Sequence, residues 1–326
     1  MEDKEKEYHE SIDPKEVKPL EEFKNTIATI TEKKDKAVIN PFILLDNDLL
    51  IHFLRARKLN VKKATKMLLD YLHWKAKINL DELYSNYVFK EKYRLQLLFP
   101  HGFHKLTKDG CPIYFKIMCK LNAGELFKIS TAEEITKYSI QIYERLERDY
   151  FKICSNLKGN YIHGVFNIID FKGIGTSLLN KQLLNYVKET FKICQDYFPE
   201  TLDWLYVING GLLFRSFYTA VKVFLDSKTK TKIKVFGNNY QEGLLEKIDP
   251  ENLPKLFGGK CECPGGYLFS NEGPWKKPEE NQINIPEDIL KQRKELTDFL
   301  TYGRIQTSPE DEIKNKGKEG INVDDL

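Results

Sequence analysis

Apolar residues recur with two different periods along the chain, and the change of period divides it into two units. Between residues 46 and 98 they fall at helical spacing, as Leu50, Phe53 and Leu54 do. A second helical run begins after Asn60, a residue type that caps helix N-termini. Helices this short must pack against one another, so we predict a small helical N-terminal domain over residues 23–98.

After the Lys-Asp-Gly sequence at 108–110 the apolar period becomes typical of strands. Strands are predicted at residues 113–115, 163–170, 205–209 and 233–237. Helical patterns separate them at about 131–157 and 176–196, and an apolar helix is predicted at 212–225. Strands that alternate with helices of this length indicate an α/β fold with a mainly parallel sheet.

The two ends of the chain carry little apolar periodicity. Residues 1–22 are rich in Lys and Glu and are predicted to form a flexible charged arm. Residues 276–302 are predicted to be a partly helical extension, and the polar residues 303–326 a disordered tail.

Composition narrows the class of protein. The chain has 326 residues, of which 51 are basic and 48 acidic, and this near-balance argues against a general nucleic-acid binder. Its six cysteines are scattered, which favours reduced thiols in the cytosol over a disulfide scaffold. The pairs Cys261-x-Cys263 and His101-x-x-His104 lack further ligands at metal-site spacing, so we expect no metal.

No catalytic motif is complete in the sequence. The loop at residues 170–177 follows a predicted strand and precedes a helix, but it lacks the third glycine of a dinucleotide-binding fingerprint. No Walker loop and no nucleophile elbow occur. We therefore expect no enzyme activity.

The predicted helix at 212–225 is apolar around most of its circumference. Such a helix lies in a core, or it covers a cavity with one face and meets lipid with the other. Asp203, Arg215 and Lys222 interrupt the apolar stretch around it, so we do not predict a transmembrane span. Four lysines follow, at 228, 230, 232 and 234, either on a solvated edge strand or with one of them facing an anion.

Five segments in series resemble the CRAL-TRIO lipid-binding family. They are LLIHFLRARKLNVKKATKMLLDYLHWK (49–75), DGCPIYF (109–115), NIIDFKGIG (167–175), DYFPETLDWLYVINGGLLFRSFYTAVKVFLD (196–226) and ENLPKLFGG (251–259). The resemblance covers about residues 45–275. GYLFSNEGPW (266–275) is typical of the yeast-type phosphatidylinositol/phosphatidylcholine transfer branch. The resemblance implies a lipid-binding domain over residues 99–275, in which the sheet floors an apolar cavity closed by a mobile gate helix.

By this resemblance the helix at 212–225 is the gate, and Gly210 and Gly211 lie at its hinge. One face would close over acyl chains, and the other would enter a membrane when the gate opens. The gate cannot turn all its large side chains inward, so some are expected to face outward. Its aromatic and branched positions are Phe214, Phe217, Tyr218, Val221 and Phe224.

The resemblance also implies a pocket for an inositol phosphate. Asp226 is a good N-cap, so residues 227–232 can form a helical turn with Thr229 and Lys232 on one face. Lysines 228, 230 and 234 are then expected to be solvated charges. The chain's residues at the family's pocket positions are Arg57, Lys58, Glu200, Thr229 and Lys232.

The chain departs from the branch where the branch holds phosphatidylcholine. The family's Tyr, Ser and Thr are replaced by Phe103, Val165 and Asn167. Phe103 lacks the hydroxyl group, and Val165 cannot form a hydrogen bond with its side chain. We therefore expect phosphatidylcholine to be a poor ligand.

The resemblance implies a monomeric, non-enzymatic cytoplasmic protein that binds phosphatidylinositol and exchanges phospholipid during transient membrane contact. It implies no cofactor beyond the bound lipid, and a phosphatidylinositol kinase is a candidate partner. Two alternatives stay open. One is a carrier of a sterol, tocopherol-like or retinoid ligand, and the other is a sensor that stimulates a lipid kinase without moving lipid.

Overall fold

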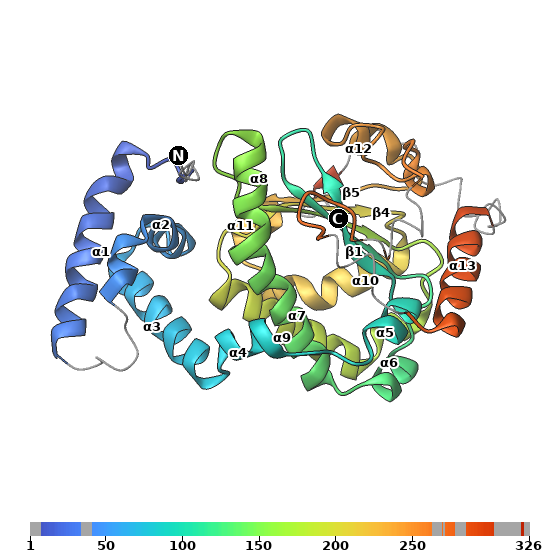
Figure 1. The fold of residues 1–326 in the computed structure, drawn as a ribbon, viewed down its shortest axis with the longest axis horizontal. Coiled ribbons are helices and arrows are strands. Elements are labelled where there is room, and N and C mark those ends of the chain that lie inside the picture. The colour runs from blue at the N-terminus through green and yellow to red at the C-terminus, as the bar shows by residue number, and fades with distance from the viewer. Residues whose placement is uncertain are drawn as a thin grey trace.

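The computed structural model describes residues 8–33, 41–262, 269, 271–277, 285–302 and 321–322. A group of helices at the N-terminus stands beside an α/β domain (Figure 1). The N-terminal helices are α1 (Pro14–Lys33), η1 (Pro41–Leu45), α2 (Asn47–Ala56), α3 (Val61–Lys77), α4 (Leu80–Asn86) and α5 (Lys92–Leu98).

Local capping and apolar packing explain the first helices. The Asp46 side chain accepts from the Leu49 N–H at the start of α2, and Asn60 caps α3 in the same way. The sequence predicted a flexible arm over residues 1–22, but α1 begins at Pro14. Its apolar side chains recur at helical spacing, and Phe23 and Ile27 are fully buried in the core shared with α2 and α3. Residues 1–7 of the expected arm lie outside the described residues.

The α/β domain is built on a sheet with the strand order β1-β2-β3-β4-β5-β6. Strands β2 to β5 are parallel, and β1 and β6 add an antiparallel strand at each edge, so the prediction of a mainly parallel sheet is confirmed. The strands are β1 (His101–Leu106), β2 (Pro112–Ile117), β3 (Val165–Asp170), β4 (Leu202–Ile208), β5 (Ile233–Val235) and β6 (Ile321–Asn322).

Two of these strands were not predicted. Strand β1 lies before the Lys-Asp-Gly turn, where its histidines break the apolar alternation. Strand β6 lies inside the segment that was expected to be disordered, and it pairs with β5. The rest of the expected tail, residues 303–320 and 323–326, lies outside the described residues.

Helices cover both faces of the sheet, and Figure 1 shows α12 and α10 on opposite sides of it. One face carries Ile113, Phe115 and Phe166 and packs against α12, η5 and α13. The other carries Tyr114, Lys116 and Asn167 and faces a cavity. The remaining elements are α6 (Ala123–Ile129), α7 (Ala132–Arg145), η2 (Leu146–Tyr150), α8 (Phe151–Lys158), η3 (Thr176–Leu179), α9 (Lys181–Tyr197), α10 (Leu212–Val221), η4 (Lys222–Phe224), α11 (Ser227–Thr231), α12 (Gln241–Lys247), η5 (Lys255–Phe257) and α13 (Glu287–Tyr302).

Candidate functional site

An apolar cavity of about 170 Å³ lies between the sheet and the helices on one of its faces. Strands β1 to β3 supply its floor, which includes Phe103, Tyr114 and Asn167. Helices α7 and α9 supply its walls, and α10 contributes Phe217. The volume is below the roughly 300–1,000 Å³ typical of pockets for drug-sized ligands. A ligand with two acyl chains therefore fits only if a wall moves.

Helix α10 divides into a buried and an exposed face. Phe214, Phe217, Tyr218 and Val221 are buried in the core, and the Phe171 ring meets Phe214 edge-on at 4.9 Å between centroids. The large apolar side chains that face outward sit at the ends of the segment and are mostly aliphatic. They are Leu212, Val223 and Phe224, exposed by 80%, 71% and 36%.

The end of the segment differs from its prediction as a continuous helix over 212–225. The α-helix stops at Val221, and Lys222–Phe224 form a 3₁₀ turn. The Gln195 side chain of α9 donates to the Phe224 carbonyl at 2.6 Å, and the Lys188 ammonium lies 4.9 Å from the centre of the Phe224 ring. Helix α9 thus holds the C-terminal end of the gate segment.

The two glycines before α10 have different surroundings. A Cβ atom on Gly210 would lie 2.6 Å from Cγ1 of Val235, so this position needs a residue without a side chain. Gly211 has open space around it and a φ of −89°, which any residue can adopt. Close packing therefore explains Gly210, and neither packing nor backbone strain explains Gly211.

The three positions that depart from the choline pocket lie together on the cavity floor. Phe103 and Val165 are 6% and 3% exposed, and Asn167 is half-buried. The Phe103 ring packs between aromatic rings, with its centroid 4.6 Å from that of Tyr114 and 4.9 Å from that of Tyr150. The Asn167 amide donates to the Val165 carbonyl at a long 3.4 Å.

The residues expected to bind the inositol phosphate come together only in part. Asp226 caps α11 as predicted, accepting from the Thr229 N–H at 2.9 Å. The Lys232 ammonium donates to the Leu202 carbonyl at the start of β4. Glu200 lies two positions before that strand, and it forms an ion pair with Lys228. The Thr229 hydroxyl donates to Asp226 at 2.6 Å instead of pointing away from its own turn.

Two lysines that were expected to be solvated have specific partners. Lys228 pairs with Glu200, whose side chain is only 14% exposed. The Lys234 ammonium lies over the Trp204 and Tyr206 rings, at 5.3 and 5.9 Å from their centres. The sequence could not reveal these pairings because they join segments that are apart in the chain.

The basic pair from the N-terminal domain lies at the end of α2. The Arg57 guanidinium lies 3.7 Å from the carboxylate of Asp196 in α9. Arg57 therefore contacts the α/β domain at a residue four positions before Glu200 in the sequence. Lys58 is exposed and adopts a φ of 51°. Thus Glu200, Lys228 and Lys232 form one cluster, while Arg57 pairs with a different carboxylate.

Burial lowers the pKa of two lysines, one in the cluster with Glu200 and one at the cavity. Burial lowers the pKa of Lys232, and the Glu200 carboxylate partly opposes that effect. Burial also lowers the pKa of Lys116, whose side chain reaches the cavity from β2. The sequence analysis missed Lys116, although its alternation with Tyr114 on the strand would have placed both on the same face.

Within the described segments, no helix is both long and apolar enough to cross a membrane. The same segments contain no group of three or more His, Cys, Asp and Glu residues that could hold a metal ion. His101 and His104 are both buried, and the His101 ring contacts the Phe99 carbonyl at 2.6 Å.

A mainly parallel sheet that floors an apolar cavity, covered by a helix that packs its apolar face inward, defines a binding protein for apolar or amphipathic ligands. Comparison with known proteins gives the family. The family model described as CRAL/TRIO domain matches residues 99–259, and that described as CRAL/TRIO, N-terminal domain matches residues 19–70. The chain belongs to the CRAL/TRIO family.

Two relatives and one solved structure illustrate the similarity. The Sec14 cytosolic factor of Schizosaccharomyces pombe is 36% identical over 71% of this chain and 80% of its own length. The phosphatidylinositol/phosphatidylcholine transfer protein SFH9 of Arabidopsis thaliana is 33% identical over 83% of this chain, which spans about half (49%) of that relative. The crystal structure of Sfh5 shares the fold, with a TM-score of 0.62 and 18% identity over 86% of this chain and 99% of its own.

Proposed function

We propose that this chain binds phosphatidylinositol and exchanges phospholipid between membranes without catalysing a reaction. The name of the relative SFH9, a phosphatidylinositol/phosphatidylcholine transfer protein, supports phospholipid as the ligand class and transfer as the activity. The apolar cavity supports it independently, because acyl chains need a site removed from water. Burial of each methylene is worth about 0.8 kcal/mol in protein and bilayer alike, so headgroup contacts set the selectivity.

The observation that carries the proposal is the position of Lys232. Its ammonium group is partly buried at the start of β4, close to the carboxylate of Glu200 and to a second cation, Lys228. A phosphodiester needs cationic partners when it leaves water, and inositol hydroxyls can donate to a carboxylate. This cluster offers both kinds of partner at one edge of the lipid domain.

The gate has a specific part in this proposal. A cavity of about 170 Å³ must enlarge to take a phospholipid, and α10 is the wall with exposed apolar side chains at its two ends, Leu212 at its start and Val223 in the following η4 turn. We expect α10 to swing outward at a membrane surface and to lay Leu212 and Val223 on the lipid. The protein would act as a monomer in the cytoplasm and touch membranes transiently, with a phosphatidylinositol kinase as a candidate partner.

Transfer of labelled phosphatidylinositol between vesicles tests the proposal. Lys232→Ala should reduce the transfer rate about tenfold or more, because one charge-assisted hydrogen bond contributes about 1.5–3 kcal/mol. Lys230→Ala, in the same turn but off that face, should change it less than twofold. Equal losses of transfer in both variants would show that the cluster acts only as a nonspecific basic surface. A wild-type protein that binds phosphatidylinositol and stimulates a lipid kinase, yet moves no lipid, would favour a sensor.

A further inference from the structure

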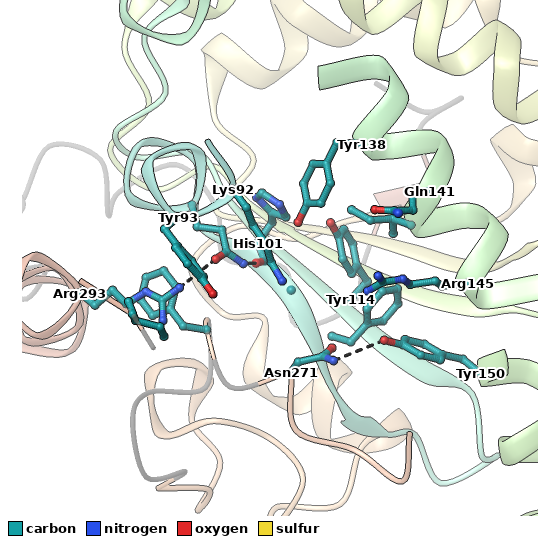
Figure 2. Close-up of a pocket in the computed structure, with 16 residues that line it drawn as sticks. Lys92, Tyr93, His101, Tyr114, Tyr138, Gln141, Arg145, Tyr150, Asn271 and Arg293 are labelled. Carbon is teal, nitrogen blue, oxygen red and sulfur yellow. Dashed lines mark hydrogen bonds between the residues drawn. The ribbon is translucent and has the colours of Figure 1, made fainter. Parts of the chain in front are cut away.

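A second pocket, of about 110 Å³, adjoins the lipid cavity (Figure 2). It lies where α5, the start of β1, α7 and α13 meet. His101, Phe103, Tyr114 and Tyr138 line both this pocket and the apolar cavity, so the two spaces share a wall of side chains. A molecule with its chains in the cavity can therefore place a small headgroup here.

The charged residues among the described lining of this pocket are all basic. Lys92 of α5, Arg145 of α7 and Arg293 of α13 line it, and Figure 2 shows them approaching from different sides. None of the described residues that line the pocket is Asp or Glu. Arg145 and Arg293, which have no acidic neighbour among these described lining residues, favour an anionic occupant.

Arg293 gives the most direct sign of a missing partner. Its side chain is 6% exposed, with the guanidinium group 4.7 Å from the centre of the Tyr93 ring and 4.5 Å from that of Phe269. One nitrogen, Nη2, donates to Gln96 at 3.1 Å. Nε is buried and donates to no described residue. A buried guanidinium with no acidic partner among the described residues is costly, and an anion in the pocket that Arg293 lines would supply the counter-charge.

Arg145 adds a second guanidinium group from the opposite side. It projects from the last turn of α7 toward Tyr114 (Figure 2), and it forms no ion pair with any described residue. Planar guanidinium groups bind phosphate oxygens through paired hydrogen bonds. Two of them facing one small space suit a group with more than one anionic oxygen.

The position of the pocket separates it from the inositol cluster. Strand β1, at this pocket, and strand β5, which follows Lys232, have three strands between them in the sheet. Arg145 and Arg293 disfavour a choline group here, because its quaternary ammonium would lie beside like charges. We propose that the pocket binds the terminal phosphate of a lipid without a headgroup alcohol, the phosphatidic acid class, with its acyl chains in the adjoining cavity. This proposal rests on the proposed lipid transfer, and it names a second ligand of the same protein.

Vesicle transfer with two tracers tests the pocket. Donor vesicles of phosphatidylcholine carry labelled phosphatidic acid in one arm and labelled phosphatidylinositol in the other. The wild-type chain should transfer both lipids. Arg145→Gln and Arg293→Gln should each reduce phosphatidic acid transfer about tenfold, through the lost charge-assisted bond, and change phosphatidylinositol transfer less than twofold. Arg94→Gln is the matched control, because this exposed arginine of α5 pairs with Glu91 outside the pocket.

The outcomes separate this proposal from the proposed function. Phosphatidylinositol transfer without phosphatidic acid transfer would overturn the pocket assignment alone, whereas the absence of phosphatidylinositol transfer would overturn the function. Equal losses of both lipids in the arginine variants would also overturn the assignment. Calorimetric titration with inorganic phosphate tests whether the pocket is a site for free phosphate. A chain that binds inorganic phosphate but does not transfer phosphatidic acid would have such a site, and this result would overturn the proposal. If the buried Arg293→Gln variant does not fold, the exposed Arg145 still gives a decisive result.

Discussion

Lys228, at the start of α11, forms an ion pair with Glu200, the residue two positions before β4. The Lys228 side chain is 51% exposed and that of Glu200 is 14% exposed, so the pair stands at the rim of the cluster that also contains Lys232. Glu200 adopts a φ of 66°, a conformation that is uncommon outside glycine, and this turns the chain where its carboxylate meets α11.

Lys228→Ala should reduce phosphatidylinositol transfer about fivefold, less than Lys232→Ala. The partly exposed pair contributes ~1 kcal/mol, and its loss leaves Glu200 less well positioned for the inositol hydroxyls. Vesicle transfer at low and high salt measures the effect, which should shrink as salt screens the wild-type pair. A variant with unchanged transfer at low salt would show that Lys228 has no part in headgroup binding.

The hinge prediction changes once the surroundings of both glycines are known. Gly211→Ala should fold normally but slow lipid exchange, since Ala restricts the backbone angles open to the gate without meeting any atom. Gly210→Ala should lower stability by about 1–3 kcal/mol through its clash with Val235, and Val235→Ala should restore part of that loss. Thermal unfolding measures the change in stability, and vesicle transfer measures the change in exchange rate, so the two measurements together separate these effects. An unchanged exchange rate in Gly211→Ala would move the hinge elsewhere.

The outer edge of the gate should contact the membrane. Leu212→Asp should weaken binding to vesicles several-fold without changing the amount of lipid bound, because Leu212 is 80% exposed and does not line the cavity. Leu157 of α8 is also exposed, by 63%, and Leu157→Asp serves as the control. Vesicle flotation measures the difference. Equal loss in both variants would mean that vesicle binding does not depend on the gate.

Phosphatidylcholine transfer should be much weaker than phosphatidylinositol transfer. A triple variant should transfer more phosphatidylcholine, because each new residue supplies a hydroxyl group at the cavity floor. Its substitutions are Phe103→Tyr, Val165→Ser and Asn167→Thr. The buried Val165→Ser change should also cost about 1–3 kcal/mol of stability until a ligand satisfies the new group. If the unmodified chain moves both lipids equally well, the departure at these positions does not exclude choline.

Acid should destabilise the fold through His101. Burial, reinforced by nearby lysines, lowers the pKa of His101 from 6.5 to about 4. The unfolded chain then binds more protons than the folded chain between these values, so the stability is complete above pH 6.5 and falls as the pH falls toward 4. At pH 5 the loss is ~2 kcal/mol. Urea unfolding at pH 7 and pH 5 should show a smaller loss of stability in His101→Gln. The control His73→Gln, at an exposed position of α3, should show the full loss.

The sequence predicted the order of the main elements because each has a strong local signal. The caps Asp46, Asn60 and Asp226 all act as their residue types indicate. Helix α1 had a signal too, in the spacing of Leu20, Phe23 and Ile27, but the surrounding charges obscured it.

The site was harder to predict because it depends on tertiary contacts. Nothing local tells Lys228 from its neighbours, and its partner Glu200 lies 28 positions away. The pocket around Arg293 is assembled from four distant segments, so no motif marks it.

The central claim is tested most directly by the lipid that the protein carries. Mass spectrometry of lipid extracted from protein purified without detergent should show phosphatidylinositol strongly enriched over its share of the host membranes, and Lys232→Ala should remove the enrichment. A sterol or another neutral apolar molecule in its place, with phosphatidylinositol at background, would contradict the claim.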